Sequence, residues 1–140
     1  MTTPGKVSVL AVAPSQHDRT ALEHIFSHSN WEIEFARSLS GLAARVNRDE
    51  FGVVFTPERM PDGDWRDVLG EIESCQSSPK LLVVTDRVDG DTWAEVINRG
   101  GYDVLVKPFA PREVMWLVSQ AWMAWRSDRQ AGPAVSAPLP

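Results

Sequence analysis

Residues 100–109 read Gly-Gly-Tyr-Asp-Val-Leu-Val-Lys-Pro-Phe, and this stretch decides the fold. Its centre, residues 104–106, is a short apolar run that ends at Lys107. A second such run, Leu-Leu-Val-Val-Thr, occupies residues 81–85 and ends at Thr85. Short continuous runs of this kind are typical of strands buried on both faces of a parallel sheet. The two runs therefore predict buried strands whose carboxyl ends carry a lysine and a threonine.

Three further strand-like runs extend this pattern over the chain. Residues 7–13 and 51–56 are largely apolar, and residues 31–36 alternate in polarity. Between the strands and after the last one, apolar residues recur at helical spacing, around Leu22, Leu42, Leu69, Val96 and Leu117. Strands joined by helical crossovers are parallel and are covered on both faces. The sequence therefore predicts an α/β fold, a doubly wound parallel sheet of five strands with five helices.

The length of 140 residues fits one compact domain, and 43% hydrophobic residues suffice for its core. The last helical pattern ends near Arg126, so we expect the folded domain to span residues 1–126. Residues 127–140 are rich in Pro, Ala and Ser, which predicts a flexible tail.

The composition argues against several classes of protein. The net charge is −5 and no run of Lys or Arg forms a basic stripe, so a nucleic-acid surface is not expected. No apolar run is long enough to span a membrane or to serve as a signal peptide. Cys75 is the single cysteine, which excludes an intramolecular disulfide and favours a reduced, cytoplasmic location. His24 and His28 lie one helical turn apart, but no third ligand supports a metal site.

An open doubly wound sheet places its site at the carboxyl ends of the strands. Here those ends are Ala13-Pro14, Thr56-Pro57, Thr85-Asp86 and Lys107-Pro108. The chemistry of the protein is therefore expected at this edge.

In the order of its motifs the chain resembles the bacterial response-regulator receiver domain, over roughly residues 6–126. The resemblance rests on residues 9–12, 59–63, 81–85 and 100–109. They are similar to that family's first strand, the Met-Pro loop after its phosphorylated strand, its fourth strand with a switch threonine, and its Lys-Pro-Phe stretch. The resemblance implies a flavodoxin-like fold, Thr85 and Lys107 as switch residues, and a cis peptide bond before Pro108.

The chain departs from that family where the phosphoryl chemistry takes place. Two acids after the first strand and one after the third hold magnesium in the family, and the third acid accepts the phosphoryl group. The resemblance places Ala13 and Pro14 at the acid pair, Pro57 at the acceptor and Val104 at the switch aromatic. Alanine and proline offer no side-chain oxygen to a metal or a phosphoryl group. The resemblance thus implies a pseudo-receiver that has no catalytic residue and binds no metal or cofactor.

Thr85 and Lys107 remain, and each has an ordinary structural explanation. The hydroxyl of Thr85 is expected to bond to the backbone at the end of its strand. An unpaired buried lysine is costly, so Lys107 is expected to pair with Glu58 or Asp86, or to reach water. The alternative is that Lys107 binds a small anion.

Three acids near the end of the third strand are candidates for a replacement phosphoacceptor: Glu58, Asp62 and Asp64. A displaced carboxylate would lack the metal and the geometry that phosphoryl transfer needs. They are therefore interpreted as solvated loop acids.

The last helix carries an apolar stripe opposite its core-facing side. Trp116 and Met123 lie seven positions apart on this stripe, and such a stripe commonly marks an interaction surface. The alternative is that the tail folds back over it. Receiver domains dimerise through the face of the fourth helix, fifth strand and fifth helix. The resemblance therefore implies a homodimer interface through Trp116 and Met123, with Trp93 and Tyr102.

The preferred hypothesis is a stand-alone atypical receiver in bacterial two-component or phosphorelay signalling. It would act by contact with a histidine kinase, another regulator or a second copy, without phosphorylation of its own and without enzyme activity. Two alternatives stay open: a receiver phosphorylated on Glu58, Asp62 or Asp64, and a flavodoxin-like module that binds a small anion. Against the last, residues 13–16 form no Gly-rich phosphate loop.

Overall fold

The computed structural model describes residues 6–13 and 15–131. Within these residues the chain forms, in order, β1 (Ser8–Val12), α1 (Gln16–Phe26), β2 (Glu32–Ala36), α2 (Leu39–Arg48), β3 (Val53–Pro57), β4 (Arg59–Met60), β5 (Gly63–Asp64), α3 (Trp65–Glu73), β6 (Lys80–Thr85), α4 (Gly90–Arg99), β7 (Asp103–Val106) and α5 (Pro111–Ala131). No helix in this part of the chain is both long and apolar enough to cross a bilayer.

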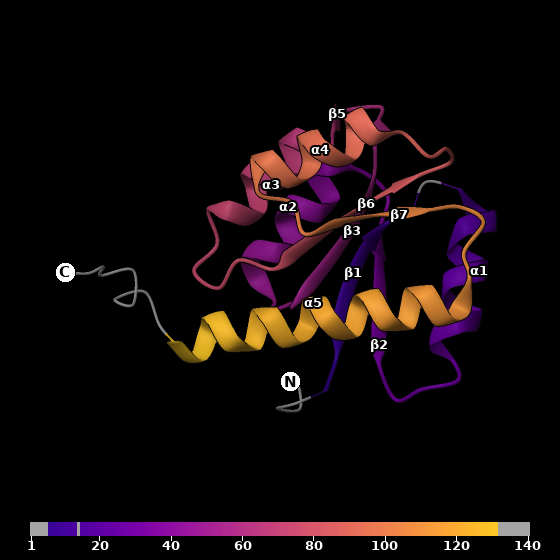
Figure 1. Cartoon of the computed structure of the whole chain (residues 1–140). Helices are drawn as coiled ribbons and strands as arrows, with labels where there is room; N and C mark the ends of the chain where they lie inside the picture. The colour runs from indigo at the N-terminus through magenta and orange to yellow at the C-terminus, as the bar shows by residue number, and fades with distance from the viewer. Residues whose placement is uncertain (1–5, 14, 132–140) are drawn as a thin grey trace.

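The five long strands form one parallel sheet in the order β2-β1-β3-β6-β7. Helices α1 and α5 cover one face of the sheet, and α2, α3 and α4 cover the other, as Figure 1 shows. This arrangement confirms the predicted doubly wound α/β fold. Because every strand is parallel, the carboxyl ends of all five lie at one edge of the sheet, hereafter the carboxyl edge. The opposite edge is the amino edge.

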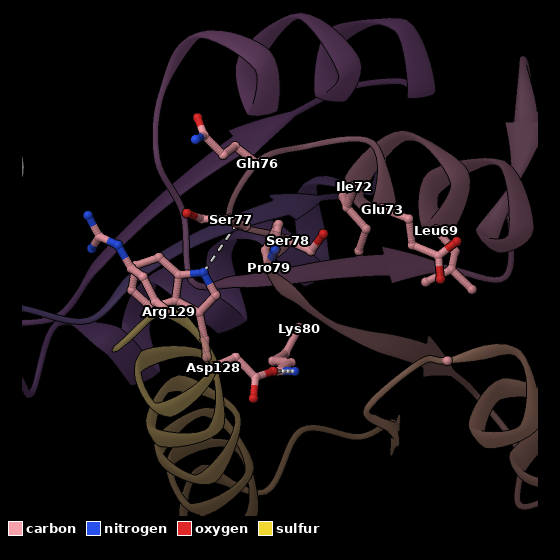
Figure 2. Close-up of a pocket in the computed structure, with 12 residues that line it drawn as sticks. Leu69, Ile72, Glu73, Gln76, Ser77, Ser78, Pro79, Lys80, Asp128 and Arg129 are labelled. Atoms are coloured by element: carbon pink, nitrogen blue, oxygen red, sulfur yellow. Dashed lines mark hydrogen bonds and ion pairs between the residues drawn. The ribbon is translucent and has the colours of Figure 1, made fainter. Parts of the chain in front are cut away.

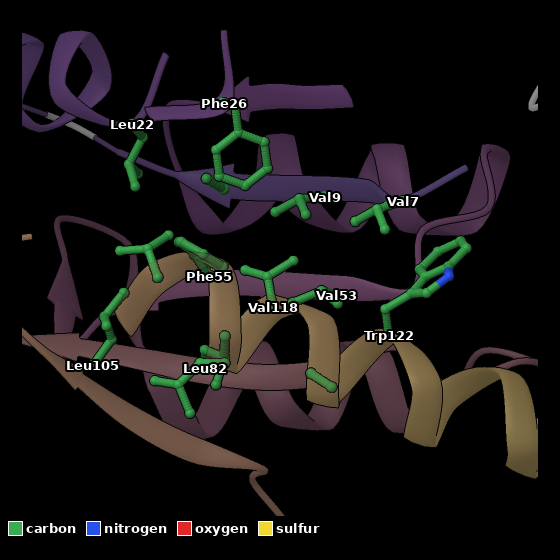
Figure 3. Packing of buried hydrophobic residues seen from close by; sticks show 14 of the residues in the cluster. Val7, Val9, Leu22, Phe26, Val53, Phe55, Leu82, Leu105, Val118 and Trp122 are labelled. Carbon is green, nitrogen blue, oxygen red and sulfur yellow. The ribbon is translucent and has the colours of Figure 1, made fainter. Parts of the chain in front are cut away.

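The core consists of two layers because successive strand residues point to opposite faces. Val9 and Ala11 of β1 pack with α1 and α5, whereas Leu10 and Val12 pack with α2, α3 and α4. Figure 3 shows the first layer, in which Phe55 of the central strand lies between the sheet and the helices. Phe55 is 1% exposed. The continuous apolar runs that predicted fully buried strands therefore supply side chains to both halves of the core.

A short antiparallel hairpin, β4 and β5, interrupts the path from β3 to α3. The resemblance implied only a loop here, at residues 59–63. Asp64 ends the hairpin and starts α3: its carboxylate accepts from the backbone N–H groups of Arg66 and Asp67, and Asp67 bonds back to the N–H of Asp64. This reciprocal capping box satisfies backbone donors that the first helical turn leaves unpaired.

Two predicted boundaries are wrong. The third strand was expected to end at Thr56, but Pro57 is its last residue and pairs with Val84. The last helix was expected to end near Arg126, but α5 continues to Ala131. Ion pairs of Asp128 with Lys80 and of Arg129 with Glu50 attach this extension to the rest of the domain. The rest of the predicted tail, residues 132–140, lies outside the described residues.

Candidate functional site at the carboxyl edge

The carboxyl edge gathers most of the residues that the sequence singled out. Ala13 follows β1 and is buried, Pro57 ends β3 and is half-buried, and Thr85 ends β6 and is 5% exposed. Lys107 follows β7, and the Lys107–Pro108 peptide bond is cis. Pro14, the second predicted acid-pair position, lies outside the described residues.

Lys107 forms an ion pair with Asp18, in the first turn of α1. Its Nζ donates to Asp18 Oδ2 at 2.9 Å, and the two side chains are 32% and 19% exposed. The prediction that Lys107 pairs with Glu58 or Asp86 is therefore wrong. The lysine charge is neutralised by an acid of α1, rather than by an acid of the loops that follow β3 and β6.

Asp18 is the site residue that the sequence reasoning missed. It lies three positions after Ser15, a spacing that suggests a helix cap, and its backbone N–H does donate to Ser15 Oγ at 3.3 Å. Its carboxylate, however, is directed to Lys107. Because α1 follows β1, its first turn lies at the carboxyl edge, and so does Asp18 in that turn. This position in the topology was the signal from which the sequence could have identified Asp18.

Thr85 makes its shortest contact with Glu58. The Thr85 hydroxyl donates to Glu58 Oε1 at 2.8 Å, and the backbone N–H of Arg87 donates to Thr85 Oγ1 at 3.4 Å. The expected bond to the backbone is thus present but secondary. Glu58 follows Pro57 directly, so this contact joins the ends of the neighbouring strands β3 and β6.

The other two candidate acids cap helices. Asp62 accepts from the backbone N–H groups of Leu39 and Ser40 at 3.0 and 3.1 Å, at the start of α2. These backbone hydrogen bonds hold the pKa of Asp62 below its ordinary value of 3.8. For Asp64, burial opposes ionisation, but the bonds from Asp67 and Arg66 prevail and its pKa is also lowered. Each acid therefore stabilises local backbone structure instead of being merely solvated.

Beside these caps lies a polar hollow of about 400 Å³, lined by residues 58–60, 63–67, Thr92 and Glu95. The ion pair of Arg66 with Glu95 joins α3 to α4 there, at 2.6 Å. Across residues 6–13 and 15–131, no three His, Cys, Asp or Glu side chains gather in a way that could hold a metal ion. The expected absence of a metal stays a prediction.

The predicted interface residues divide between two surfaces. Trp93 of α4 is 50% exposed, and its Nε1 donates to Asp103 of β7 at 3.0 Å. Tyr102, just before β7, is half-buried against the core layer of α1 and α5. Both therefore lie at the β7 side of the sheet.

Trp116 and Met123 are each 61% exposed on α5. Trp116 lines a shallow apolar hollow with Trp31, Pro111, Arg112, Met115 and Ser119. Trp31 precedes β2, and β2 and β7 are the two outer strands of the sheet. Trp116 thus lies toward the β2 side of the sheet and Trp93 toward the β7 side, and the homodimer interface through these residues stays a prediction.

A third hollow, of about 550 Å³, lies at the amino edge and is shown in Figure 2. Trp125 lines this hollow, and its Nε1 donates to the carbonyl oxygen of Ser77 at 3.3 Å. The Lys80–Asp128 ion pair lies beside it. Trp125 is paired with Ser77 and Lys80 with Asp128, and both pairs attach α5 to the rest of the domain. We therefore interpret this hollow as part of the contact between α5 and the sheet.

The remaining candidates contribute no chemistry. His24 and His28 stack edge to face, with ring centroids 5.0 Å apart, on the exposed side of α1. Burial raises the pKa of the Cys75 thiol, which disfavours the reactive thiolate.

Comparison with known proteins explains the arrangement. The response regulator receiver domain family matches residues 9–119. The chain is 27% identical over 127 residues to the DNA-binding transcriptional regulator NtrC of Bradyrhizobium sp. (strain RP501 Parasponia), covering 91% of this chain and 26% of that protein. It is 26% identical to the chemotaxis protein CheY of Listeria monocytogenes, covering 82% of this chain and 98% of that protein. The chain thus spans about a quarter of the length of the NtrC relative.

Solved structures show the same fold. The signal receiver domain of an HD domain-containing protein from Pseudomonas fluorescens Pf-5 superposes with a TM-score of 0.81 at 23% identity, covering 93% of this chain and 96% of that one. The beryllofluoride-activated NtrC4 receiver domain dimer superposes with a TM-score of 0.77 at 23% identity, covering 84% and 98%. With the family matched over most of its length and its site at the carboxyl edge, the chain belongs to the response-regulator receiver domain family.

Proposed function

We propose that this receiver domain takes part in two-component signalling through protein contact, without phosphorylation of an aspartate of its own. The observation that carries the proposal is Pro57 at the end of β3. The resemblance assigns the phosphoacceptor to this position, and proline has no side-chain oxygen. Ala13, at the end of β1, likewise offers no ligand to the metal that phosphoryl transfer requires.

The charges at the site support the same function. The ammonium of Lys107, which would otherwise attract phosphoryl oxygens, is bound to Asp18 at 2.9 Å. Each acid near Pro57 is engaged: Glu58 with Thr85, Asp62 with the start of α2, and Asp64 with the start of α3. Each of these carboxylates therefore already has a structural contact in the fold.

Incubation with acetyl phosphate and magnesium tests this proposal. The intact mass of the chain should stay unchanged, while a CheY with its phosphoacceptor, used as the positive control, gains one phosphoryl group. The competing function, a receiver phosphorylated on an unusual acid, predicts an adduct that disappears in Glu58→Gln, Asp62→Asn or Asp64→Asn. Such an adduct would overturn the proposal and identify the acceptor.

The anion-binding function has less support, because Asp18 already neutralises Lys107. Titration with inorganic phosphate, followed by NMR of the amides around Lys107, should show no saturable shift. Saturable binding that Lys107→Met abolishes would revive this alternative.

Protein contact remains the proposed mode of action, with a histidine kinase, another regulator or a second copy as the partner. One solved relative is named as a receiver domain dimer, which supports self-association. The exposed Trp93 and Trp116 are separate candidate anchors, since buried Trp residues commonly dominate binding energy at interfaces.

Sedimentation separates the two anchors. If the chain self-associates, either Trp93→Glu or Trp116→Glu should shift it toward monomer without altering its circular dichroism. A wild-type chain that is monomeric at roughly tens of micromolar, the range of ordinary regulatory affinities, would exclude the homodimer. The surfaces would then belong to a different protein. That the domain stands alone also stays a prediction, which its size in native cells would test.

A further inference from the structure

Thr85 is the centre of a directed chain of hydrogen bonds. The backbone N–H of Arg87 donates to Thr85 Oγ1 at 3.4 Å, and the Thr85 hydroxyl donates to Glu58 Oε1 at 2.8 Å. The Arg87 N–H donates to the Thr85 oxygen, and the Thr85 hydroxyl donates in turn to the Glu58 carboxylate, so each bond polarises the next. Thr85 is 5% exposed, which places this chain in a medium where such bonds are stronger than in water.

Lys107 does not compete for the carboxylate of Glu58. A lysine that follows the neighbouring strand would be the natural counter-ion for Glu58, but its Nζ is held by Asp18 at 2.9 Å. Glu58 is therefore left to accept from the Thr85 hydroxyl. The Asp18–Lys107 pair and the Glu58–Thr85 pair form two separate connections across the carboxyl edge.

The Glu58–Thr85 pair is bonded to the start of a surface segment. Residues 86–89 lead from β6 to α4, and the N–H of Arg87 is bonded to Thr85 near their start. Asp89 caps α4 at the other end of the segment. Val88 lies between Arg87 and Asp89 and is 86% exposed, and Trp93 lies in the first turn of α4 and is 50% exposed. Large apolar side chains displayed on an anchored loop and helix start are suited to contact a protein.

We propose that the Glu58 carboxylate is an internal latch: through Thr85 it holds residues 86–93 in one conformation, so that Val88 and Trp93 are presented permanently. The latch would regulate the surface of Val88 and Trp93. It rests on the proposed function in one respect: no phosphoryl group enters the carboxyl edge. A negatively charged group of the chain itself then acts on Thr85. Signalling through this surface would be controlled by the amount of protein or of its partner, and not by a phosphate.

Hydrogen exchange and NMR of the full chain test the latch. Glu58→Ala removes the acceptor, and Thr85→Val removes the hydroxyl while keeping the shape of the side chain. Each should accelerate amide exchange at residues 86–89 about tenfold and shift the indole N–H signal of Trp93. That factor corresponds to about 1.4 kcal/mol. The double variant should exchange no faster than Thr85→Val alone, because loss of the hydroxyl already breaks the connection to Glu58.

Three controls make the result specific. Thr85→Ser keeps a hydroxyl and Glu58→Gln keeps an acceptor oxygen, so both should retain most of the protection. Glu23→Gln removes an exposed charge on α1 and should change nothing in this segment. Exchange in Glu58→Ala within about twofold of wild type, or factors that multiply in the double variant, would overturn the latch. If Glu58→Ala does not fold, Thr85→Val against Thr85→Ser decides the question by the same readout.

Acetyl phosphate separates failure of the latch from failure of the proposed function. The mass of the wild-type chain reports phosphorylation, and exchange at residues 86–89 reports the latch. Unchanged mass with rapid exchange only in the latch variants supports both proposals. A phosphoryl adduct overturns the proposed function. It also overturns the latch, because a phosphoryl group would then occupy the site in which Glu58 is proposed to act on Thr85. Unchanged mass with exchange insensitive to Glu58→Ala overturns the latch alone.

Discussion

Different interactions stabilise the two edges of the sheet. At the amino edge, Trp122 and Trp125 stack with ring centroids 4.8 Å apart. They lie so close to Gly52 that a Cβ there would come within 2.4 Å of Trp122. Both indoles are buried, and Trp125 also donates to Ser77. This edge is an apolar, close-packed junction between α5 and the sheet.

At the carboxyl edge the connections are polar and partly exposed. Asp18 binds Lys107 and Glu58 binds Thr85, with no aromatic side chain between the members of either pair. Close packing contributes far more to stability than an ion pair in contact with water. We therefore expect substitutions at the amino edge to destabilise the domain more than substitutions at the carboxyl edge. Four measurements would test this division.

The largest effect is expected for Trp125→Ala. Trp125 is 3% exposed, and its removal leaves a cavity and an unpaired carbonyl at Ser77. We expect a loss of about 3–5 kcal/mol in the free energy of unfolding, measured by urea denaturation. Trp116→Ala, on the exposed side of the same helix, should change it by less than about 0.5 kcal/mol. Equal losses in the two variants would mean that packing at the amino edge does not contribute more to stability than the exposed side of α5.

Gly52→Ala should destabilise the domain by about 1–3 kcal/mol, because the added methyl collides with the rigid ring of Trp122. The control is Gly70→Ala in α3, where no atom lies within 4 Å of the added Cβ. That change should stabilise the domain by about 0.5–1 kcal/mol, since alanine favours a helix. Thermal unfolding of both variants gives the two signs, and the same sign in both would contradict the tight contact.

The Asp18–Lys107 pair should be worth only about 1 kcal/mol, because both side chains are partly exposed. A double-mutant cycle of Asp18→Asn and Lys107→Met in urea measures this coupling. The Lys6–Glu32 pair, whose side chains are 29% and 50% exposed, is the matched control and should couple by less than about 0.5 kcal/mol. A loss of several kcal/mol in Lys107→Met alone would show that the carboxyl edge is structurally essential after all.

The smallest effect concerns Asp62 and its cap on α2. Its folded-state pKa is lowered by the bonds from Leu39 and Ser40, below the ordinary value of 3.8. The carboxylate therefore adds stability above that pH, and the contribution is lost as the pH falls through the folded pKa. Asp62→Asn should flatten the decline of stability in this acid range, followed by denaturation at several pH values. A decline as steep as in the wild type would mean that the cap does not stabilise the fold.

Most of the fold could be predicted because its signals are local. Apolar runs, helical spacing and the glycine at the end of α4, Gly100 with φ of 107°, each reflect preferences of neighbouring residues. The end of α5 could not be predicted in this way. Ser127 to Ala131 lack the apolar spacing of the core-facing turns, and ion pairs with Lys80 and Glu50, distant in sequence, help to attach them.

The candidate site divides along the same line. The sequence by itself determined which side chains lie at the carboxyl edge, because a strand's last residue and the sheet's direction place Pro57, Thr85 and Lys107 there. Only the tertiary structure decided their partners. Asp18 reaches Lys107 across 89 positions of sequence, and Glu58 reaches Thr85 across 27. Which carboxylate meets which donor depends on distances of a few ångströms between elements, and no local preference of the chain encodes those distances.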